Sequence, residues 1–186
     1  GFFVKEPVVM FAPLLFFYDL IFKRKLDTSN YFSKANFKNN ILPAFWVAFP
    51  AFIVAIVLFL FSRSMTPEHW RPTNITQYDY LITQPFVLVH YFNNFMLPVN
   101  LSADTDWTAL NSMADDRFFA GIGFIAAMLA LAFYSLRKEE LKPVAFGIFW
   151  FFIALIPTSS IFPLGEVLND HRTFFPYIGL VMAIGT

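Results

Sequence analysis

The sequence predicts an all-α fold: a polytopic α-helical integral membrane protein with about five spanning helices and one interfacial or re-entrant helix. Of the 186 residues, 58% are hydrophobic and only 14% are charged, whereas soluble domains are about half apolar and about a quarter charged. Several apolar runs approach or exceed the roughly 20 residues that a helix needs to cross a bilayer. Most charged residues lie between these runs, as expected of loops outside the hydrocarbon.

The predicted spans divide a single transmembrane domain. They cover residues 2–22, 41–62, 118–136, 143–162 and 174–186. Pro50 lies inside the second span, where we expect a kink because proline removes a helical hydrogen bond. Asp115 and Asp116 precede the third span and are expected to act as negative charge at a helix N-terminus. Because the chain begins at Gly1 without a methionine and stops inside an apolar run, we expect it to be an internal piece of a longer protein.

The distribution of lysine and arginine predicts which loops are cytoplasmic. These residues concentrate in segments 23–40 and 137–142, whereas segment 158–173 carries only Arg172. Because cytoplasmic loops are enriched in basic residues, we expect the first two segments inside and segments 63–117 and 158–173 on the non-cytoplasmic face.

One apolar stretch does not fit a crossing. Residues 85–101 are short for a span and contain His90, Asn93 and Asn94. A single crossing there would force segment 137–142 to the outer face, against the charge rule. We therefore expect an interfacial or re-entrant helix on the outer face.

Composition narrows the functional classes. The net charge is zero, so no global basic field attracts nucleic acid. The chain lacks cysteine, which excludes disulfides, thiolate metal sites and a cysteine nucleophile. No dinucleotide-binding, phosphate-loop or metallohydrolase motif occurs. We expect no cofactor and no metal.

The most polar interruption between apolar segments is the strongest candidate site. Glu166, Asp170, His171 and Arg172 lie between two apolar runs, and ionisable residues beside hydrocarbon are commonly functional. Thr173 is a plausible N-cap of the helix that follows. The free N–H groups of that helix and the planar arginine fork suit a phosphate. A phosphate pocket and an ordinary loop with Arg172 paired to a neighbouring carboxylate remain open alternatives.

Other polar residues have weaker signals. Lys5 and Glu6 are adjacent, so they do not face each other on a helix and fit snorkelling at a membrane edge. Asp104 and Asp106 suit a general base or metal ligands, but without a third ligand a solvated loop is the simpler interpretation. His90 suits either a polar cavity or a hydrogen-bonded structural role.

Several short blocks, in this order, resemble the transmembrane-and-tetratricopeptide O-mannosyltransferases and their bacterial relatives, within the GT-C glycosyltransferase fold. The blocks are Val4-Lys-Glu-Pro7 with Tyr18-Asp-Leu20, Leu81-Ile-Thr-Gln84 with Leu97-Pro-Val-Asn-Leu101, Asp104-Thr-Asp-Trp107, and the run from Glu166 to Gly179. Together they span most of the chain.

The resemblance implies an enzyme that moves a sugar from a polyprenyl-phosphate donor to a protein or glycan acceptor on the non-cytoplasmic face of a bacterial inner membrane or an endoplasmic-reticulum-type membrane. It implies the following roles: Arg172 and His171 bind the donor phosphate, Glu166, Asp170, Lys5 and Glu6 are pocket neighbours, and Asp104, Asp106 and His90 are acceptor-side candidates.

The chain departs from the family pattern in three respects. In the family a glutamate precedes the arginine of this block, whereas this chain has Asp170 and His171 before Arg172. The catalytic aspartate of the family belongs to a loop upstream of this chain, and its tetratricopeptide repeats lie downstream.

Two rival functions differ in class. One is a non-catalytic, GT-C-derived structural subunit of a larger membrane complex, in which the numerous phenylalanines face lipid or partner subunits. The other is a lipid flippase or transporter. That function needs polar residues along the spans, and residues 41–62 and 118–136 contain no charged residue in their interiors.

Overall fold

A computed structural model describes residues 9–24, 26, 28–31, 33–64, 75–99, 107–159, 167–168 and 173–185. Within these ranges every regular element is a helix and no strand occurs, so the all-helical prediction is confirmed for the described residues. The helices are α1 (Phe11–Tyr18) continued by the π-helical turn η2 (Asp19–Lys23), the short α2 (Lys34–Asn36) and η3 (Phe37–Ile41) leading into α3 (Leu42–Ser64), α4 (Gln77–Met96), α5 (Asp116–Ser135), the 3₁₀ turn η4 (Glu139–Leu141), α6 (Lys142–Leu155) and α7 (Phe174–Ile184).

Two described helices are long and apolar enough to cross a membrane. They are the continuous helix over residues 34–61 and α5. In each, only 17% of the apolar window is buried within the protein, whereas the core helix of a soluble protein is mostly buried. These helices therefore present apolar side chains outward.

Two of the predicted spans coincide with described helices, and parts of the other three, residues 2–8, 160–162 and 186, lie outside the described residues. Predicted residues 41–62 and 118–136 coincide closely with α3 and α5. The described parts of the other three spans are shorter: α1 with η2 covers 11–23, α6 ends at Leu155, and α7 ends at Ile184. α6 ends in a turn that contains Pro157, which has no N–H to continue the helical ladder. Five full spans are thus not seen in the described residues.

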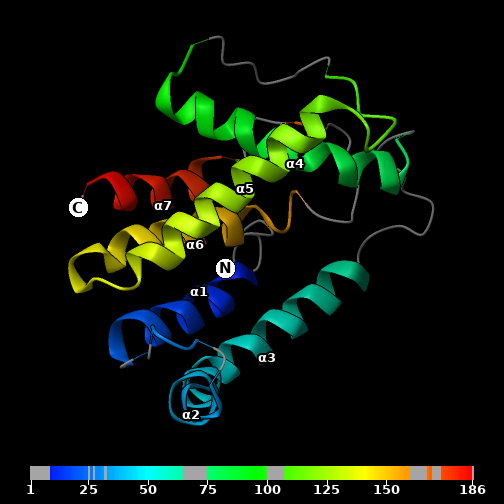
Figure 1. Ribbon diagram of the computed structural model, residues 1–186. Coiled ribbons are helices and arrows are strands. Elements are labelled where there is room, and N and C mark those ends of the chain that lie inside the picture. Colours follow the sequence, from blue (N-terminus) through cyan, green and yellow to red (C-terminus); the bar gives the residue numbers. More distant parts are fainter. Residues whose placement is uncertain are drawn as a thin grey trace.

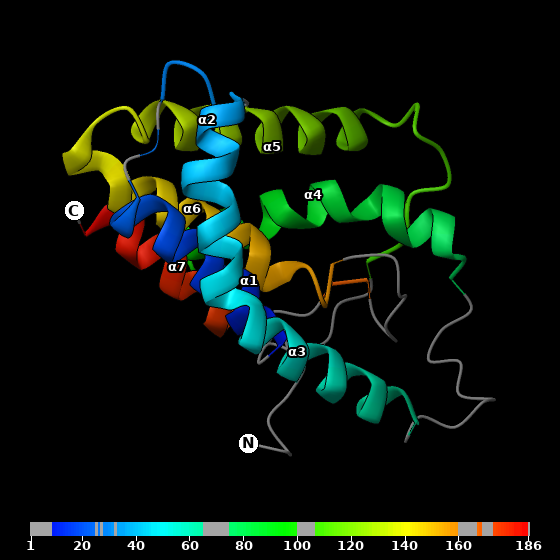
Figure 2. The same ribbon diagram turned by 90° about the horizontal axis from the view of Figure 1, so that it is seen from below.

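The helices form a bundle centred on α6 (Figures 1 and 2). α7 packs most extensively against α6, while α5 and α1 contact other parts of α6. α3 contacts α1, and three alanines of α3, Ala44, Ala48 and Ala55, are buried. Figure 2 shows α3 changing direction along its length, as expected of the helix that contains Pro50.

Both basic loops lie at the same end of the bundle. The hydroxyl of Tyr31, in the loop after η2, donates to the carbonyl oxygen of Phe133 near the end of α5, at 3.0 Å. A hollow of about 330 Å³ between this loop and the α5–α6 turn is lined by Thr28, Arg137 and Lys142, among others. The co-location of the two basic loops is the geometry that the charge-based prediction requires.

α4 and α5 run in the same direction. Near the start of α5, Gly121 lies against the backbone of Pro85, and a Cβ added there would lie 2.6 Å from the nitrogen of Phe86. Further along both helices in the same sense, the rings of Phe92 and Phe124 are 5.2 Å apart. The chain between two such parallel neighbours has to return to the end from which α4 began. The first residues of α4 and the first residues of α5 therefore lie at the same end of the bundle (Figure 2). The chain between Met96 and Asp116 is called the return segment below.

Candidate functional site

α4 begins earlier than the sequence predicted. Thr76 is its N-cap: its hydroxyl oxygen accepts from the backbone N–H of Asp79 at 3.1 Å and donates to the Asp79 carboxylate at 2.7 Å. The predicted helix over residues 85–101 was wrong at both ends, because α4 spans Gln77–Met96 and contains Pro85 in its interior. The polar residues before Pro85 suggested a loop; in the structure they form the buried face of a helix.

The N-terminal half of α4 carries polar side chains that bind two loops. Tyr80, Thr83 and Gln84 are each at most 3% exposed. The Tyr80 hydroxyl donates to the carbonyl oxygen of Thr158 at 2.5 Å. The Thr83 hydroxyl donates to the Asp79 carbonyl oxygen at 2.6 Å and accepts from the N–H of Leu110 at 2.8 Å. These bonds fix the segment after α6 and the segment before α5 on the same helix face.

Gln84 connects α4 to a third segment. Its amide nitrogen lies 3.4 Å from the carbonyl oxygen of Val167, to which it donates. Val167 and Leu168 are buried in one apolar cluster with Val87 and Tyr91 of α4. The amide oxygen of Gln84 is buried and accepts no hydrogen bond within the described part of the chain. A buried acceptor without a hydrogen bond reduces the stability of the fold by about 1–3 kcal/mol. A hydrogen-bond donor placed next to this oxygen would therefore be stabilised.

An aromatic stack continues the same face. The Trp107 ring lies nearly parallel to Phe86, with centroids 5.5 Å apart, and 5.0 Å from the ring of His90. Asn94, one turn further along α4, has its amide nitrogen 2.9 Å from Nε2 of His90. His90 is therefore half-buried between a tryptophan and an amide.

His90 is the one predicted site residue that falls within the described ranges. The other predicted site residues lie outside them: Lys5, Glu6, Asp104, Asp106, Glu166, Asp170, His171 and Arg172. Two of their chain neighbours are described and contact α4. Trp107 follows Asp106 in the chain, and Val167 follows Glu166.

Thr173, which follows Arg172, occupies the predicted N-cap position of α7. The capping interaction itself was predicted wrongly. The backbone of Thr173 is helical, with φ −85° and ψ −11°, and its side chain makes no capping hydrogen bond to α7. A capping side chain needs an extended backbone to reach the free N–H groups of the first turn, and this conformation does not supply one.

At the N-terminus of α5 the predicted acidic cap is confirmed. Asp115 is the N-cap, and its carboxylate accepts from the backbone N–H of Arg117 at 2.9 Å and from its guanidinium at 2.8 and 3.0 Å. The side-chain hydrogen bond from Arg117 is the main reason that the pKa of Asp115 falls to about 2. The carboxylate therefore remains charged throughout the physiological range.

Within the described ranges, no group of three or more His, Asp or Glu side chains is arranged to hold an ion. The polar groups of the α4 face are instead hydroxyls, an amide and an imidazole, which suit hydrogen bonding to neutral or anionic oxygen.

Sequence reasoning singled out His90 as a candidate site residue. It gave no role to Tyr80, Thr83 or Gln84, although Thr83 and Gln84 belong to one of the blocks that carry the family resemblance. The signal was present as spacing: Tyr80, Thr83, Gln84, Val87 and Tyr91 recur at three- and four-residue intervals, which is one face of a helix. Their polarity obscured this pattern.

Comparison of the chain with protein-family models, with curated proteins and with solved structures gives no match.

Proposed function

We propose that this chain is the central membrane part of a glycosyltransferase that takes a sugar from a polyprenyl-phosphate donor and transfers it to a protein or glycan acceptor on the non-cytoplasmic face. The proposal begins from the sequence resemblance. Its main support from the structure is that α4, which carries the Leu81–Gln84 block, contacts residues at the edges of two other blocks, Trp107 and Val167.

The contacts supply a rationale for a site at this helix face. The hydroxyl of Thr83 accepts a hydrogen bond from the N–H of Leu110. The ring of Phe86 stacks on that of Trp107. The side-chain amide of Gln84 donates a hydrogen bond to the carbonyl oxygen of Val167. Two chain segments that are distant in sequence, one with Trp107 and Leu110 and one with Val167, thus meet on α4. A site assembled from several loops on a helical scaffold is the common arrangement for binding and catalysis.

The geometry of α4 also supports membrane embedding. α4 and its return segment start and end at the end of the bundle opposite the basic loops. A re-entrant helix of this kind is tolerated at membrane depth where its polar groups are buried in protein. In this arrangement α4 begins on the non-cytoplasmic side, where the lipid-linked donor is used.

In the proposed reaction an acceptor hydroxyl oxygen attacks the anomeric carbon of the sugar. The bond between that carbon and the phosphate oxygen breaks, polyprenyl phosphate departs, and the hydroxyl proton passes to a carboxylate base. In the related family that base is the upstream aspartate. Arg172 binds the phosphate and stabilises the negative charge that grows on it as the bond breaks.

The first test is donor-lipid binding by the intact protein with Arg172→Ala. We expect binding to weaken about 30-fold or more, because removing one partner of a hydrogen-bonded charge pair costs about 2–5 kcal/mol. Arg117→Ala is the matched control. Arg117 lies in the first turn of α5, so it resembles Arg172 in being an arginine near the start of a helix. Unlike the proposed phosphate ligand, it is half-exposed and paired with Asp115. Its loss should leave binding unchanged, and unchanged binding in Arg172→Ala would refute the phosphate assignment.

A non-catalytic subunit of a larger membrane complex is the second candidate. The outward face of α3 favours it, since Trp46, Val54, Val57 and Leu60 are each more than half exposed, and a partner helix would cover such a surface. Purification of the intact protein distinguishes the two functions. Sugar transfer by the isolated protein supports the enzyme, whereas inactivity together with a stable complex supports the subunit.

A further inference from the structure

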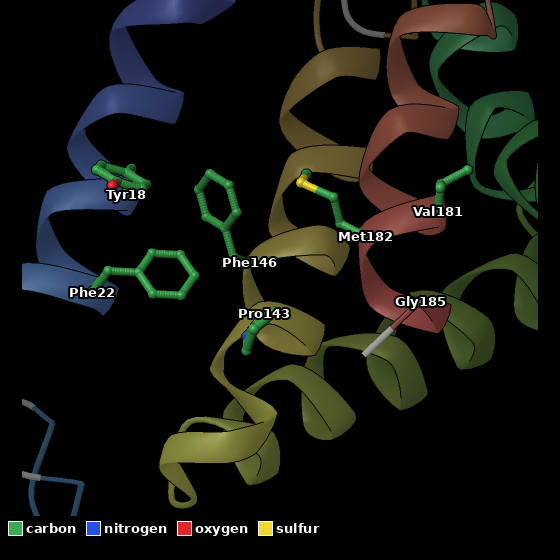
Figure 3. Close-up of a pocket in the computed structure, with 7 residues that line it drawn as sticks. All are labelled: Tyr18, Phe22, Pro143, Phe146, Val181, Met182 and Gly185. Atoms are coloured by element: carbon green, nitrogen blue, oxygen red, sulfur yellow. The ribbon is translucent and has the colours of Figure 1, made fainter.

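An open groove lies at the end of the bundle that carries the basic loops, away from α4. It has a volume of about 390 Å³. Residues from three helices line it: Tyr18 and Phe22 from α1 and η2, Pro143 and Phe146 from α6, and Val181, Met182 and Gly185 from and just after α7. Figure 3 shows the rings of Tyr18 and Phe22 facing that of Phe146.

The groove is apolar and aromatic in its walls. Phe22 and Phe146 are in edge-to-face contact at 5.4 Å, and Tyr18 lies 6.0 Å from Phe146. The tyrosine hydroxyl is the one polar side-chain group among the lining residues. Such walls suit an alkyl chain. Outside the membrane each methylene group removed from water contributes about 0.8 kcal/mol to binding. Within the membrane, van der Waals packing of the chain against the walls stabilises the bound lipid instead.

A lysine at the groove distinguishes it from a purely apolar crevice. The ammonium of Lys23 lies 5.9 Å from the centroid of the Tyr18 ring. Two other basic residues at this end are paired with carboxylates: Arg24 with Asp19 at 2.8 Å, and Lys142 with Glu139 at 2.7 Å. The ammonium of Lys23, over the ring of a lining residue, brings a positive charge to the edge of the groove.

We propose that this groove binds an anionic glycerophospholipid, with an acyl chain between η2, α6 and α7 and the phosphate beside Lys23. The inference rests on the membrane embedding in the proposed function, but not on sugar transfer. Anionic lipid is the occupant that the charge favours, because basic residues outnumber acidic ones in both loops at this end. The site is distinct from the proposed donor phosphate site: its α7 residues lie at the C-terminal end of that helix, whereas Arg172 precedes the helix in the chain.

Native mass spectrometry of the intact protein, titrated with dioleoyl-phosphatidylglycerol or dioleoyl-phosphatidylcholine, tests the proposal. We expect preferential binding of phosphatidylglycerol. Lys23→Gln should weaken that binding about fivefold and remove the preference, since a lysine near an anionic membrane surface contributes about 1 kcal/mol. Val181→Trp should weaken the binding of both lipids by filling the groove. Val181 is 58% exposed, so the larger side chain fits without disturbing the core.

Two controls keep these outcomes specific. Lys38→Gln removes an exposed lysine at the same end that does not line the groove, and it should leave binding unchanged. Donor-lipid binding should be unaffected by Lys23→Gln, so that failure here is separable from failure of the proposed function. Equal binding of the two lipids by the native protein, an effect of Lys38→Gln as large as that of Lys23→Gln, or unaltered binding in Val181→Trp would each overturn the proposal.

Discussion

At the scale of single residues, Asp115 combines two roles at the start of α5. Its carboxylate caps the first turn and accepts two hydrogen bonds from the guanidinium of Arg117. Both roles favour the charged form of the carboxyl group, and the side-chain hydrogen bond is the larger effect. The group therefore links the stability of this helix end to pH.

We predict that the contribution of the Asp115 charge to stability is lost in acid. The folded-state pKa of about 2 lies below the ordinary value of 3.8. The contribution is therefore complete above about pH 4 and disappears as the pH falls toward 2. Thermal unfolding of the native protein and of Asp115→Asn checks this, because asparagine caps as well as aspartate but carries no charge. The native protein should be more stable than the variant at pH 6, and this advantage should shrink as the pH falls from about 4 through about 2. An advantage at pH 2 as large as that at pH 6 would contradict the assignment.

Residue-scale predictions from the sequence succeeded where local chemistry decides the structure. The acidic N-terminus of α5 follows from Asp115 and Asp116 preceding an apolar run. The prediction of a capping hydrogen bond from Thr173 was wrong, because the residue type does not determine the backbone angles that such a bond requires. His90 left two roles open, and the structure shows its contacts with Trp107 and Asn94, which no local pattern predicts.

At the scale of helices, glycines determine how closely α6 and α7 approach. A Cβ added to Gly147 would collide with the carbonyl oxygen of Gly179 and lie 2.9 Å from the nitrogen of Ala183. Both are backbone atoms, which cannot move aside as a flexible side chain can. Small residues of this kind permit close helix contacts in membranes, and the α6–α7 contact is the most extensive in the bundle.

We predict that Gly147→Ala destabilises the protein by about 1–3 kcal/mol, the usual penalty for overpacking a close contact. Gly123→Ala on α5 is the matched control, because nothing lies within 4 Å of the added Cβ. Alanine there should be neutral or stabilising by up to about 1 kcal/mol, since it favours the helix over glycine. Unfolding in a graded detergent or denaturant series measures both. Equal effects of the two substitutions would show that helix propensity, not packing, determines the result.

The bounds of a helix could be predicted from the sequence only where the helix is apolar along its whole length. α3 and α5 are long and continuously apolar, so hydropathy found both within a few residues. α4 was found only in part, because Tyr80, Thr83 and Gln84 are polar and buried. Their burial is stabilised by hydrogen bonds to segments 27 to 83 residues away in sequence. Such long-range partners are not visible in a local window.

At the scale of the whole molecule, the two ends of the bundle have different chemistry. One end combines the basic loops, the polar hollow with Arg137 and the apolar groove beside Lys23. The other combines the hydrogen-bonded face of α4 with the segments around Trp107 and Val167. The charge pattern of the sequence predicted that the basic loops share a side. It did not predict which helix assembles the other end, because that depends on contacts between segments.

The parallel course of α4 and α5 leads to a topology prediction. Because the chain lacks cysteine, a single introduced cysteine reports the side of the membrane on which it lies. Tyr78, at the start of α4, and Met113, before α5, are both exposed. We predict that Tyr78→Cys and Met113→Cys react with a membrane-impermeant maleimide from the non-cytoplasmic side. Lys38→Cys, in η3, and Lys138→Cys, between α5 and α6, should react from the cytoplasmic side only.

Each pair of positions isolates one step of this topology. Tyr78 and Met113 flank α4 and its return segment, so labelling from opposite sides would mean that α4 crosses the membrane completely. Met113 and Lys138 flank α5, so labelling from the same side would mean that α5 does not cross. Lys38 and Tyr78 flank α3 in the same way. Agreement at all four positions would establish that α4 enters and returns on one face, and it would place the hydrogen-bonded α4 face on the side where the proposed donor phosphate is bound.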